Sequence, residues 1–241
     1  MELSKRLEAV AMLVQECDSL ADIGTDHGYI PIYLLEHQKI QKAVAMDINK
    51  GPLERARDHV NASHLQEKIC LRLSNGAEKL EVGEVDAVVI AGMGGPLMVN
   101  IMKNRLDVFR ALDFFVLQPQ SEIEQVRHFL QEQGFVITKE NMVYEEGKYY
   151  SMMQVESGTM NCKKECEFLY GPWLLREKNV TLLEFLKKEE KKYLELLEKL
   201  SGKDTESQRE RYAQLQELLM HNREAMAYYK EGEEIGMQSG N

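Results

Sequence analysis

The sequence lacks any long hydrophobic run. Hydrophobic residues make up 44% of its 241 positions, an ordinary share that is enough for a sizeable buried core. No apolar run approaches the roughly 18 residues that a membrane-spanning helix needs. The start of the chain, Met1 to Arg6, lacks the apolar segment of a secretory signal. We therefore expect a cytoplasmic protein that makes no use of a membrane.

Basic charge and cysteine are also scarce. The formal net charge of -10 argues against a protein that coats nucleic acid through a generally basic surface, although it leaves room for a local basic patch. The cysteines fit no zinc spacing, so we expect no metal and reduced thiols, with a disulfide between Cys162 and Cys166 as the alternative. The four cysteines are Cys17, Cys70, Cys162 and Cys166.

Internal repeats and low-complexity tracts are absent, and the chain instead changes character once, near Gly158. Before that glycine, short β-branched apolar runs alternate with amphipathic segments, the pattern of βα units around a mostly parallel sheet. Most of these runs show no polar alternation, as expected for strands that helices cover on both faces. The predicted strands are Leu20–Ile23, Ala43–Asp47, Ile69–Leu73, Val85–Ala91, Phe114–Leu117, Phe135–Tyr144 and Tyr149–Val155.

The last two predicted strands differ from the others. The short polar segment from Glu145 to Lys148 joins them, which predicts an antiparallel hairpin. Five βα strands followed by such a hairpin is the strand sequence of the class I methyltransferase fold, whereas a dehydrogenase-type Rossmann sheet more often ends in a parallel strand. Apolar spacing from Ser4 to Gln15 predicts a helix that packs on the sheet. We therefore predict an α/β, Rossmann-like domain over residues 1–158.

The part of the chain after Gly158 has helical periodicity. Apolar residues three and four positions apart form one seam between Leu182 and Leu200 and a second between Tyr212 and Tyr229. The segment from Ser201 to Asp204 contains a glycine stop, so the two helices should pack antiparallel. We therefore predict a C-terminal helical hairpin, or coiled coil, over residues 159–241, with a frayed end after residue 232.

A glycine-containing loop lies between the first predicted strand and a predicted helix at 29–36. Glycine lets the chain turn tightly while its backbone approaches a ligand. The loop lacks the three glycines with which dinucleotide enzymes hold pyrophosphate, and its carboxylates would repel that group. They suit a ligand with an ammonium and a sulfonium, which favours S-adenosylmethionine over NAD. The loop comprises Asp22, Ile23, Gly24, Thr25, Asp26, His27 and Gly28.

Two further signals stand at the ends of the next strands. Asp47 ends the second predicted strand, where an acid can accept hydrogen bonds from ribose hydroxyls. Asn75, which precedes Gly76 after the third, offers both a donor and an acceptor to an adenine edge. Because ligands bind at the carboxyl edge of such sheets, we expect a nucleoside cofactor there.

Glycines also gather after the fourth predicted strand. They indicate close backbone approach to a ligand, here the expected sulfonium methyl, or else a tight turn before a helix. The fifth strand ends at the same edge, where amides are either loop residues or substrate contacts. His27 is either a general base or a structural hydrogen-bonding residue. The two runs are Ala91, Gly92, Met93, Gly94, Gly95 and Pro96, and Leu117, Gln118, Pro119 and Gln120.

Residues 22–31, 91–95 and 117–120, followed by the helical hairpin, resemble the bacterial tRNA (adenine-22 N1)-methyltransferases. The likeness covers nearly the whole chain, and the first two motifs in this order are specific. Gln120 departs from the family, whose members usually have asparagine there, so we assign no role to this residue. The resemblance implies methyl transfer from S-adenosylmethionine to N1 of an adenine in the D-arm region of a tRNA.

The resemblance also implies residue roles. Arg6, Gly94, Gly95 and Pro119 would contact the substrate. In the cofactor site, Asp22, Gly24, Thr25, Asp26, His27 and Gly28 would surround the methionine part, Asp47 and Ile48 the ribose, Asn75 and Gly76 the adenine, and Ala91, Gly92 and Met93 the methyl group.

The expected chemistry needs little from the protein. Adenine N1 attacks with its own lone pair, so positioning contributes most of the acceleration, and a paired base must first be flipped out. The product gains positive charge unless an N6 proton leaves, and we hypothesise that Asp26 or the Gln118 carbonyl accepts it. Exposed lysines of the hairpin are either a solvated face or contacts to a tRNA arm. They are Lys187, Lys188, Lys191 and Lys192.

Two other functions remain open at this point. One is a small-molecule methyltransferase with the same cofactor site, which would turn over without tRNA. The other is a non-catalytic interaction protein whose hairpin binds a partner while the cofactor serves as a structural ligand. The acidic charge and the paired helices are compatible with either a monomer or a weak dimer.

Overall fold

The computed structural model describes residues 2–201 and 205–230. Residues 202–204 of the predicted glycine stop and the C-terminal stretch expected to fray lie outside the described residues. The chain forms two compact units, Met1–Asn161 and Cys162–Asn241. The domain limits inferred from the sequence, 1–158 and 159–241, stay predictions.

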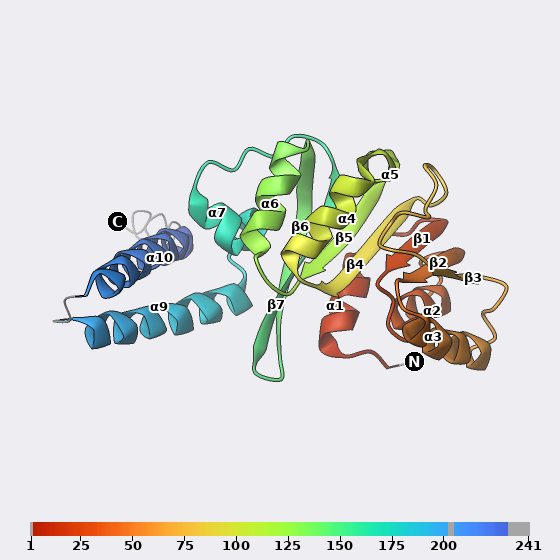
Figure 1. The fold of residues 1–241 in the computed structure, drawn as a ribbon, viewed down its shortest axis with the longest axis horizontal. Helices are drawn as coiled ribbons and strands as arrows, with labels where there is room; N and C mark the ends of the chain where they lie inside the picture. The colour runs from red at the N-terminus through yellow and green to blue at the C-terminus, as the bar shows by residue number, and fades with distance from the viewer. Residues whose placement is uncertain (1, 202–204, 231–241) are drawn as a thin grey trace, which may run out of the picture. The chain divides into compact units, whose positions relative to one another are not determined.

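The first unit is built on a seven-stranded sheet of order β3-β2-β1-β4-β5-β7-β6 (Figure 1). Strands β1 to β5 run parallel, and β7 pairs antiparallel with both β5 and β6. This mixed, Rossmann-like sheet confirms the predicted fold class. The strands are β1 (Ser19–Ile23), β2 (Lys42–Asp47), β3 (Ile69–Leu73), β4 (Ala87–Met93), β5 (Phe114–Pro119), β6 (Phe135–Glu145) and β7 (Lys148–Ser157).

The fourth strand differs from its prediction at both ends. It begins at Ala87 rather than Val85 and continues past Ala91 to Met93. The extension arises because Met93 pairs with Pro119 of β5 after a register shift that sets Gly92 apart from the ladder. Gly92 has a φ of 80°, a left-handed conformation that favours glycine.

Six helices in the described part of the first unit connect and cover these strands (Figure 1). Helix α1 starts after Ser4 of the predicted 4–15, because Ser4 acts as its N-cap and accepts a hydrogen bond from the Leu7 N–H, and it ends at Leu13. Helix α2 spans the predicted residues. The helices are α1 (Lys5–Leu13), α2 (Tyr29–Glu36), α3 (Lys50–Ala62), α4 (Gly95–Asn104), α5 (Leu106–Ala111) and α6 (Ile123–Glu132).

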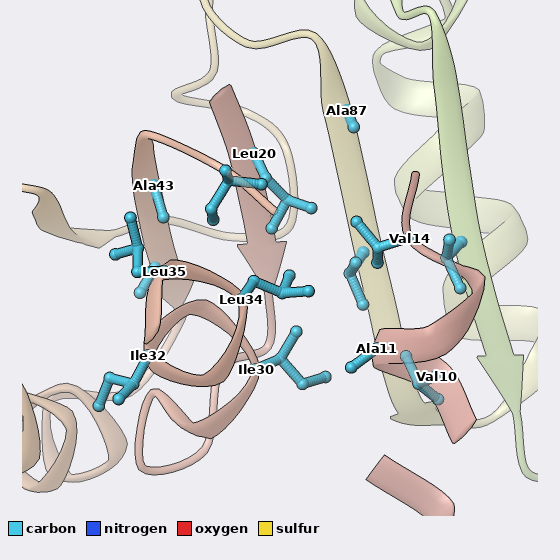
Figure 2. Close-up of a cluster of buried hydrophobic side chains, with 14 of the residues drawn as sticks. Val10, Ala11, Val14, Leu20, Ile30, Ile32, Leu34, Leu35, Ala43 and Ala87 are labelled. Atoms are coloured by element: carbon cyan, nitrogen blue, oxygen red, sulfur yellow. The ribbon is translucent and has the colours of Figure 1, made fainter. Parts of the chain in front are cut away.

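Helices α1 and α2 share one hydrophobic core on a single face of the sheet. Figure 2 shows Ile30 and Leu34 of α2 pointing toward Ala11 of α1, with Ala87 farther along β4. Leu34 and Ala11 are fully buried, as is Leu20 of β1. Burial of such side chains contributes about 25 cal/mol per Å² of apolar surface, so this core fixes α1 against the strands that carry the site.

The second unit is helical, as predicted. Two short helices, α7 (Glu165–Tyr170) and α8 (Pro172–Arg176), precede the two long ones, α9 (Val180–Leu200) and α10 (Glu206–Lys230). The long helices pack antiparallel: Asn222 of α10 donates to the Leu186 carbonyl, and Tyr229 donates to the Asn179 carbonyl at the start of α9. None of the described helices is long and apolar enough to cross a membrane.

Candidate active site

A cavity of about 470 Å³ opens at the carboxyl ends of β1, β2 and β4. The strand order reverses between β1 and β4, and open α/β sheets bind ligands at this point. Another cavity of similar size, about 440 Å³, lies at the amino ends of β1 to β3, around Lys42 and Ile69. We take the first as the candidate site because of its position. It is lined by Arg6, Leu7, Asp22, Gly24, Asp26, Tyr29, Ile30, Asp47, Ala91, Gly92, Met93 and Gln120.

The loop between β1 and α2 forms one wall of this cavity. Its backbone is left-handed at Gly24, His27 and Gly28, with φ values of 79°, 64° and 68°. The N–H groups of Gly24 and Thr25 both donate to the Met46 carbonyl at 2.8 Å, which ties the loop to β2. A Cβ atom on Gly24 would overlap the terminal methyl of Met93. That methyl is the far end of a flexible side chain and can move, so the loop needs glycine at position 24 because of its left-handed conformation.

Three carboxylates face the same cavity. Asp22 is only 5% exposed, and this burial raises its pKa to about 6, with the nearby Asp47 carboxylate adding to the rise. One oxygen of Asp47 accepts the Asn49 N–H at 2.6 Å, which leaves the other for a ligand. Asp26 completes the group at the rim. Such a concentration of negative charge favours a cationic ligand.

Asp26 is held from two sides. Its Oδ1 lies 3.0 Å from Nη2 of Arg55 on α3 and 3.5 Å from Nε2 of His27. The His27 ring stacks on Tyr29 and on His59, with centroid separations of 5.0 and 5.1 Å. His59 Nδ1 also lies 3.0 Å from the His27 carbonyl oxygen. These contacts hold the His27 ring beside Tyr29, which lies on the cavity wall.

Arg6 reaches the opposite side of the cavity from the first turn of α1. Its Nη1 donates to Gln118 Oε1 at 2.8 Å, and its guanidinium lies over the Tyr150 ring, 5.6 Å from the centroid. Gln118 is fully buried, and its Nε2 donates to the Pro119 carbonyl at 3.2 Å. Gln118 thus lies behind Arg6 rather than on the cavity wall.

The structure brings eight of the predicted site residues together on the cavity wall. Asn75 is not among them, since its Nδ2 donates to Glu78 Oε1 at 2.6 Å on an exposed loop. The roles suggested by the sequence stay predictions for both sets. The eight are Arg6, Asp22, Gly24, Asp26, Asp47, Ala91, Gly92 and Met93, while Thr25, His27, Gly28, Ile48, Asn75, Gly76, Gly94, Gly95, Gln118 and Pro119 do not line the cavity.

Sequence reasoning left out three residues that line the cavity: Leu7, Tyr29 and Ile30. Gln120, which the sequence left as either a loop amide or a substrate contact, also lies on the cavity wall. Tyr29 and Ile30 directly follow the glycine loop in the first turn of α2, so their position could have indicated them. Leu7 has no such signal, because only the packing of α1 brings it to the sheet edge. Over residues 2–201 and 205–230, no group of three or more His, Cys, Asp or Glu side chains is arranged to hold a metal ion.

Comparison with known proteins identifies similar chains. A family model described as a methyltransferase domain matches residues 3–153. The chain is 32% identical over 221 residues to a tRNA (adenine(22)-N(1))-methyltransferase of Bacillus subtilis (strain 168), a match that covers 89% of this chain and 93% of that protein.

Two solved structures share this likeness. The crystal structure of the B. subtilis M1A22 tRNA methyltransferase TrmK has a TM-score of 0.84 and 31% identity, over 93% of this chain and 98% of that one. The structure of M. capricolum TrmK in complex with the natural cofactor product S-adenosyl-homocysteine has a TM-score of 0.82 and 26% identity, over 95% and 99% of the two chains.

Proposed function

This chain belongs to the family of bacterial tRNA (adenine(22)-N(1))-methyltransferases, and we propose that it transfers a methyl group from S-adenosylmethionine to N1 of adenine 22 in tRNA. The observation that carries the proposal is one cavity whose wall contains Asp22, Asp26 and Asp47 together with Arg6. The carboxylates provide a site for a cationic cofactor, and the arginine provides one for an anionic substrate.

The residues of the cavity fit this cofactor. S-adenosylmethionine carries an ammonium and a sulfonium and supplies an electrophilic methyl group when bound. Asp22 and Asp26 are placed to face its positive charges, and the remaining oxygen of Asp47 is free to accept a ribose hydroxyl. Gly24 and Gly92 carry no side chain, so a ligand can approach their backbone closely. The volume of about 470 Å³ lies within the usual range for small-molecule sites.

The protein contributes position rather than acid or base strength to the attack. Adenine N1 already has a lone pair, so the main requirement is an oriented, unpaired base. Loss of an N6 proton would remove the positive charge that methylation puts on the product. Asp26 is the better candidate acceptor, because Gln118 is buried and its Oε1 already accepts a bond from Arg6. Arg55 and His27 both lie near Oδ1 of Asp26, which leaves Oδ2 to accept the proton.

Arg6 is our candidate for contact with the RNA. Only its Nη1 donates to a side chain of the described residues, so other guanidinium N–H groups remain for a phosphate. We also propose that the chain acts in the cytoplasm, as a monomer or a weak dimer.

The first test incubates purified protein with unmodified bulk tRNA and methyl-labelled S-adenosylmethionine, then digests the RNA and identifies the labelled nucleoside by mass. We expect 1-methyladenosine, its loss in Asp26→Ala, and its loss from a transcript with guanine at position 22. Glu146→Gln serves as the control for a single carboxylate removed at a distance from the cavity wall. Cofactor binding without transfer to any tRNA would contradict the proposal and favour a small-molecule acceptor.

A further inference from the structure

The Glu145 side chain, which is distant in the sequence, caps the first turn of α1. The Glu145 carboxylate accepts the Lys5 N–H at 2.6 Å through Oε1 and the Arg6 N–H at 3.3 Å through Oε2. Lys5 Nζ adds a bond to the Tyr144 carbonyl at 3.2 Å. A helix N-terminus has unpaired N–H groups and partial positive charge, so a carboxylate is a favourable partner for both.

Glu145 lies at the tip of the β6–β7 hairpin, which projects beside α1 (Figure 1). Glu146 and Gly147 form the turn with φ values of 47° and 82°, the left-handed pair typical of a tight hairpin. Glu145 pairs with Lys148 across the hairpin. The register of the hairpin therefore determines where the carboxylate stands.

The residue whose backbone Glu145 binds is the one whose side chain enters the cavity. From its N–H contact with Glu145, Arg6 extends over Tyr150 of β7 and donates to Gln118 at the end of β5. A Cβ atom placed on Gly92 would lie 3.6 Å from Arg6 Nη1, so the guanidinium lies close to the β4 loop. Glu145 thus binds the backbone N–H of Arg6, and Gln118 binds its guanidinium.

We propose that Glu145 is a positioning residue for the RNA substrate, acting through Arg6 with Gln118 as the second support. This proposal rests on the proposed function, since it takes RNA as the ligand of Arg6. Glu145 is absent from the cavity wall, so its effect on the cavity passes through Arg6. It fixes the helix turn from which the arginine projects, so that the remaining guanidinium N–H groups face the cavity in one orientation.

The experiment compares four variants with the wild-type protein. Glu145→Gln keeps the shape of the side chain but removes its charge and one acceptor. Glu146→Gln is the matched control, because Glu146 is exposed and makes no hydrogen bond or ion pair with a described residue. Arg6→Ala removes the proposed contact, and Glu145→Gln/Arg6→Ala closes a double-mutant cycle. Each is assayed for kcat and KM toward tRNA and for S-adenosylmethionine affinity by calorimetry.

We expect Glu145→Gln to lower kcat/KM for tRNA by about tenfold, the scale of one charge-assisted hydrogen bond, with cofactor affinity unchanged. Most of the change should appear in KM, because the contact is made in the bound state as well as in the transition state. Glu146→Gln should match the wild type. In the Arg6→Ala background, Glu145→Gln should have no further effect, since the residue through which it acts is gone.

Two results would overturn the proposal. An equal loss from Glu145→Gln with and without Arg6 would show that the two residues act independently, and a loss no greater than that of Glu146→Gln would remove Glu145 from the site. Hydrogen exchange gives a readout that does not depend on activity: the Lys5 and Arg6 amides should exchange faster in Glu145→Gln than in the wild type or in Glu146→Gln. If wild-type protein fails to methylate tRNA but this exchange difference is present, the proposed function is wrong although Glu145 caps α1. If the wild type methylates tRNA but the Lys5 and Arg6 amides exchange equally fast in Glu145→Gln, then Glu145 does not cap α1 and the further inference is wrong.

Discussion

Arg127 of α6 and Glu140 of β6 form an ion pair whose side chains are only 1% and 0% exposed, with 2.9 Å between Nη2 and Oε1. Arg127 Nε also donates to Glu140 Oε1 at 3.0 Å, and Nη2 donates to Ser151 Oγ of β7 at 3.2 Å. The pair therefore joins α6 to both antiparallel strands. Removal of one partner would leave the other buried without its counter-charge.

We predict that Glu140→Gln lowers the free energy of unfolding by about 3 kcal/mol, the usual cost of breaking a buried ion pair. The double change Arg127→Met/Glu140→Leu should recover most of this loss, because it removes both charges. Urea unfolding measures all three proteins, with Glu146→Gln as an exposed control that should lie within about 0.5 kcal/mol of wild type. A double variant less stable than Glu140→Gln would contradict the account.

The charged form of Asp22 should lower the stability of the protein and strengthen cofactor binding. Its pKa is raised by burial from 3.8 to about 6, so the native state holds the proton more tightly than the unfolded state does. Stability therefore falls as pH rises from about 4 to about 6, by up to about 3 kcal/mol for this group. Asp22→Asn should lack this fall and be more stable than wild type near pH 7.

Asp22→Asn should also weaken S-adenosylmethionine binding by at least about tenfold at pH 7.5, because it removes one carboxylate that faces the cationic ligand. Wild-type affinity should also decrease below pH 6 as Asp22 takes up a proton. Unfolding curves between pH 4 and 8 and calorimetric titrations test both parts. Identical pH dependence of stability in the two proteins would show that Asp22 does not titrate as described.

Gly95 should tolerate no side chain. A Cβ atom there would lie 2.6 Å from the carbonyl oxygens of both Ser121 and Glu122, and these backbone atoms cannot swing aside as a side chain can. We predict that Gly95→Ala destabilises the protein by about 1–3 kcal/mol and lowers methyl transfer, since it separates the loops after β4 and β5.

Gly51 provides the matched control for that prediction. It lies in α3, and a Cβ atom there would meet only Arg55 Nη1 at 3.6 Å. Gly51→Ala should leave stability unchanged or raise it by at most about 1 kcal/mol, because alanine favours the helix. Thermal unfolding and the tRNA assay compare the two variants, and equal effects would refute the steric argument.

The α9 lysines should contribute to tRNA affinity by binding phosphates. Lys187, Lys188, Lys191 and Lys192 are all exposed. Their joint replacement by glutamine should weaken tRNA binding and reduce the slope of log affinity against log salt by about 0.9 for each phosphate that the lysines had neutralised. Filter binding at several salt concentrations measures the slope. A control that replaces Lys42, Lys68, Lys79 and Lys103 should reduce the slope less. An equal reduction would indicate that the α9 lysines are only a solvated face.

Much of the fold follows from local sequence patterns. The run at 114–117 is a strand because a short, continuous apolar segment can be buried on both faces of a sheet. The run at 69–73 forms β3 at the edge of the sheet, where it is only partly buried. Tyr29–Glu36 is a helix of the predicted length because Gly28, in the left-handed conformation, starts it. The acidic loop at 22–28 and Asp47 indicated the site for the same reason: parallel strands bring their carboxyl ends to one edge.

Other features had no local signal. Helix α1 ends at Leu13 rather than at Gln15, and Lys39 Nζ donates to the Val14 carbonyl at 2.8 Å, a bond that forms only once α2 has packed nearby. The continuation of β4 to Met93 depends on its partner β5. Neither can be inferred from the residues of the segment itself, because the deciding partner lies elsewhere in the chain.

Local patterns were enough to predict the seven strands, the helix at 29–36, the two helical seams and the acidic glycine loop, because periodicity and turn chemistry act over a few residues. That Gln118 lies behind Arg6 and that Glu145 caps a helix beginning at Lys5 depends on the packed fold. These contacts join residues more than a hundred positions apart, and no spacing records such a pairing. They form because the packing of α1 on the sheet and the register of the β6–β7 hairpin bring these hydrogen-bond donors and acceptors to one edge.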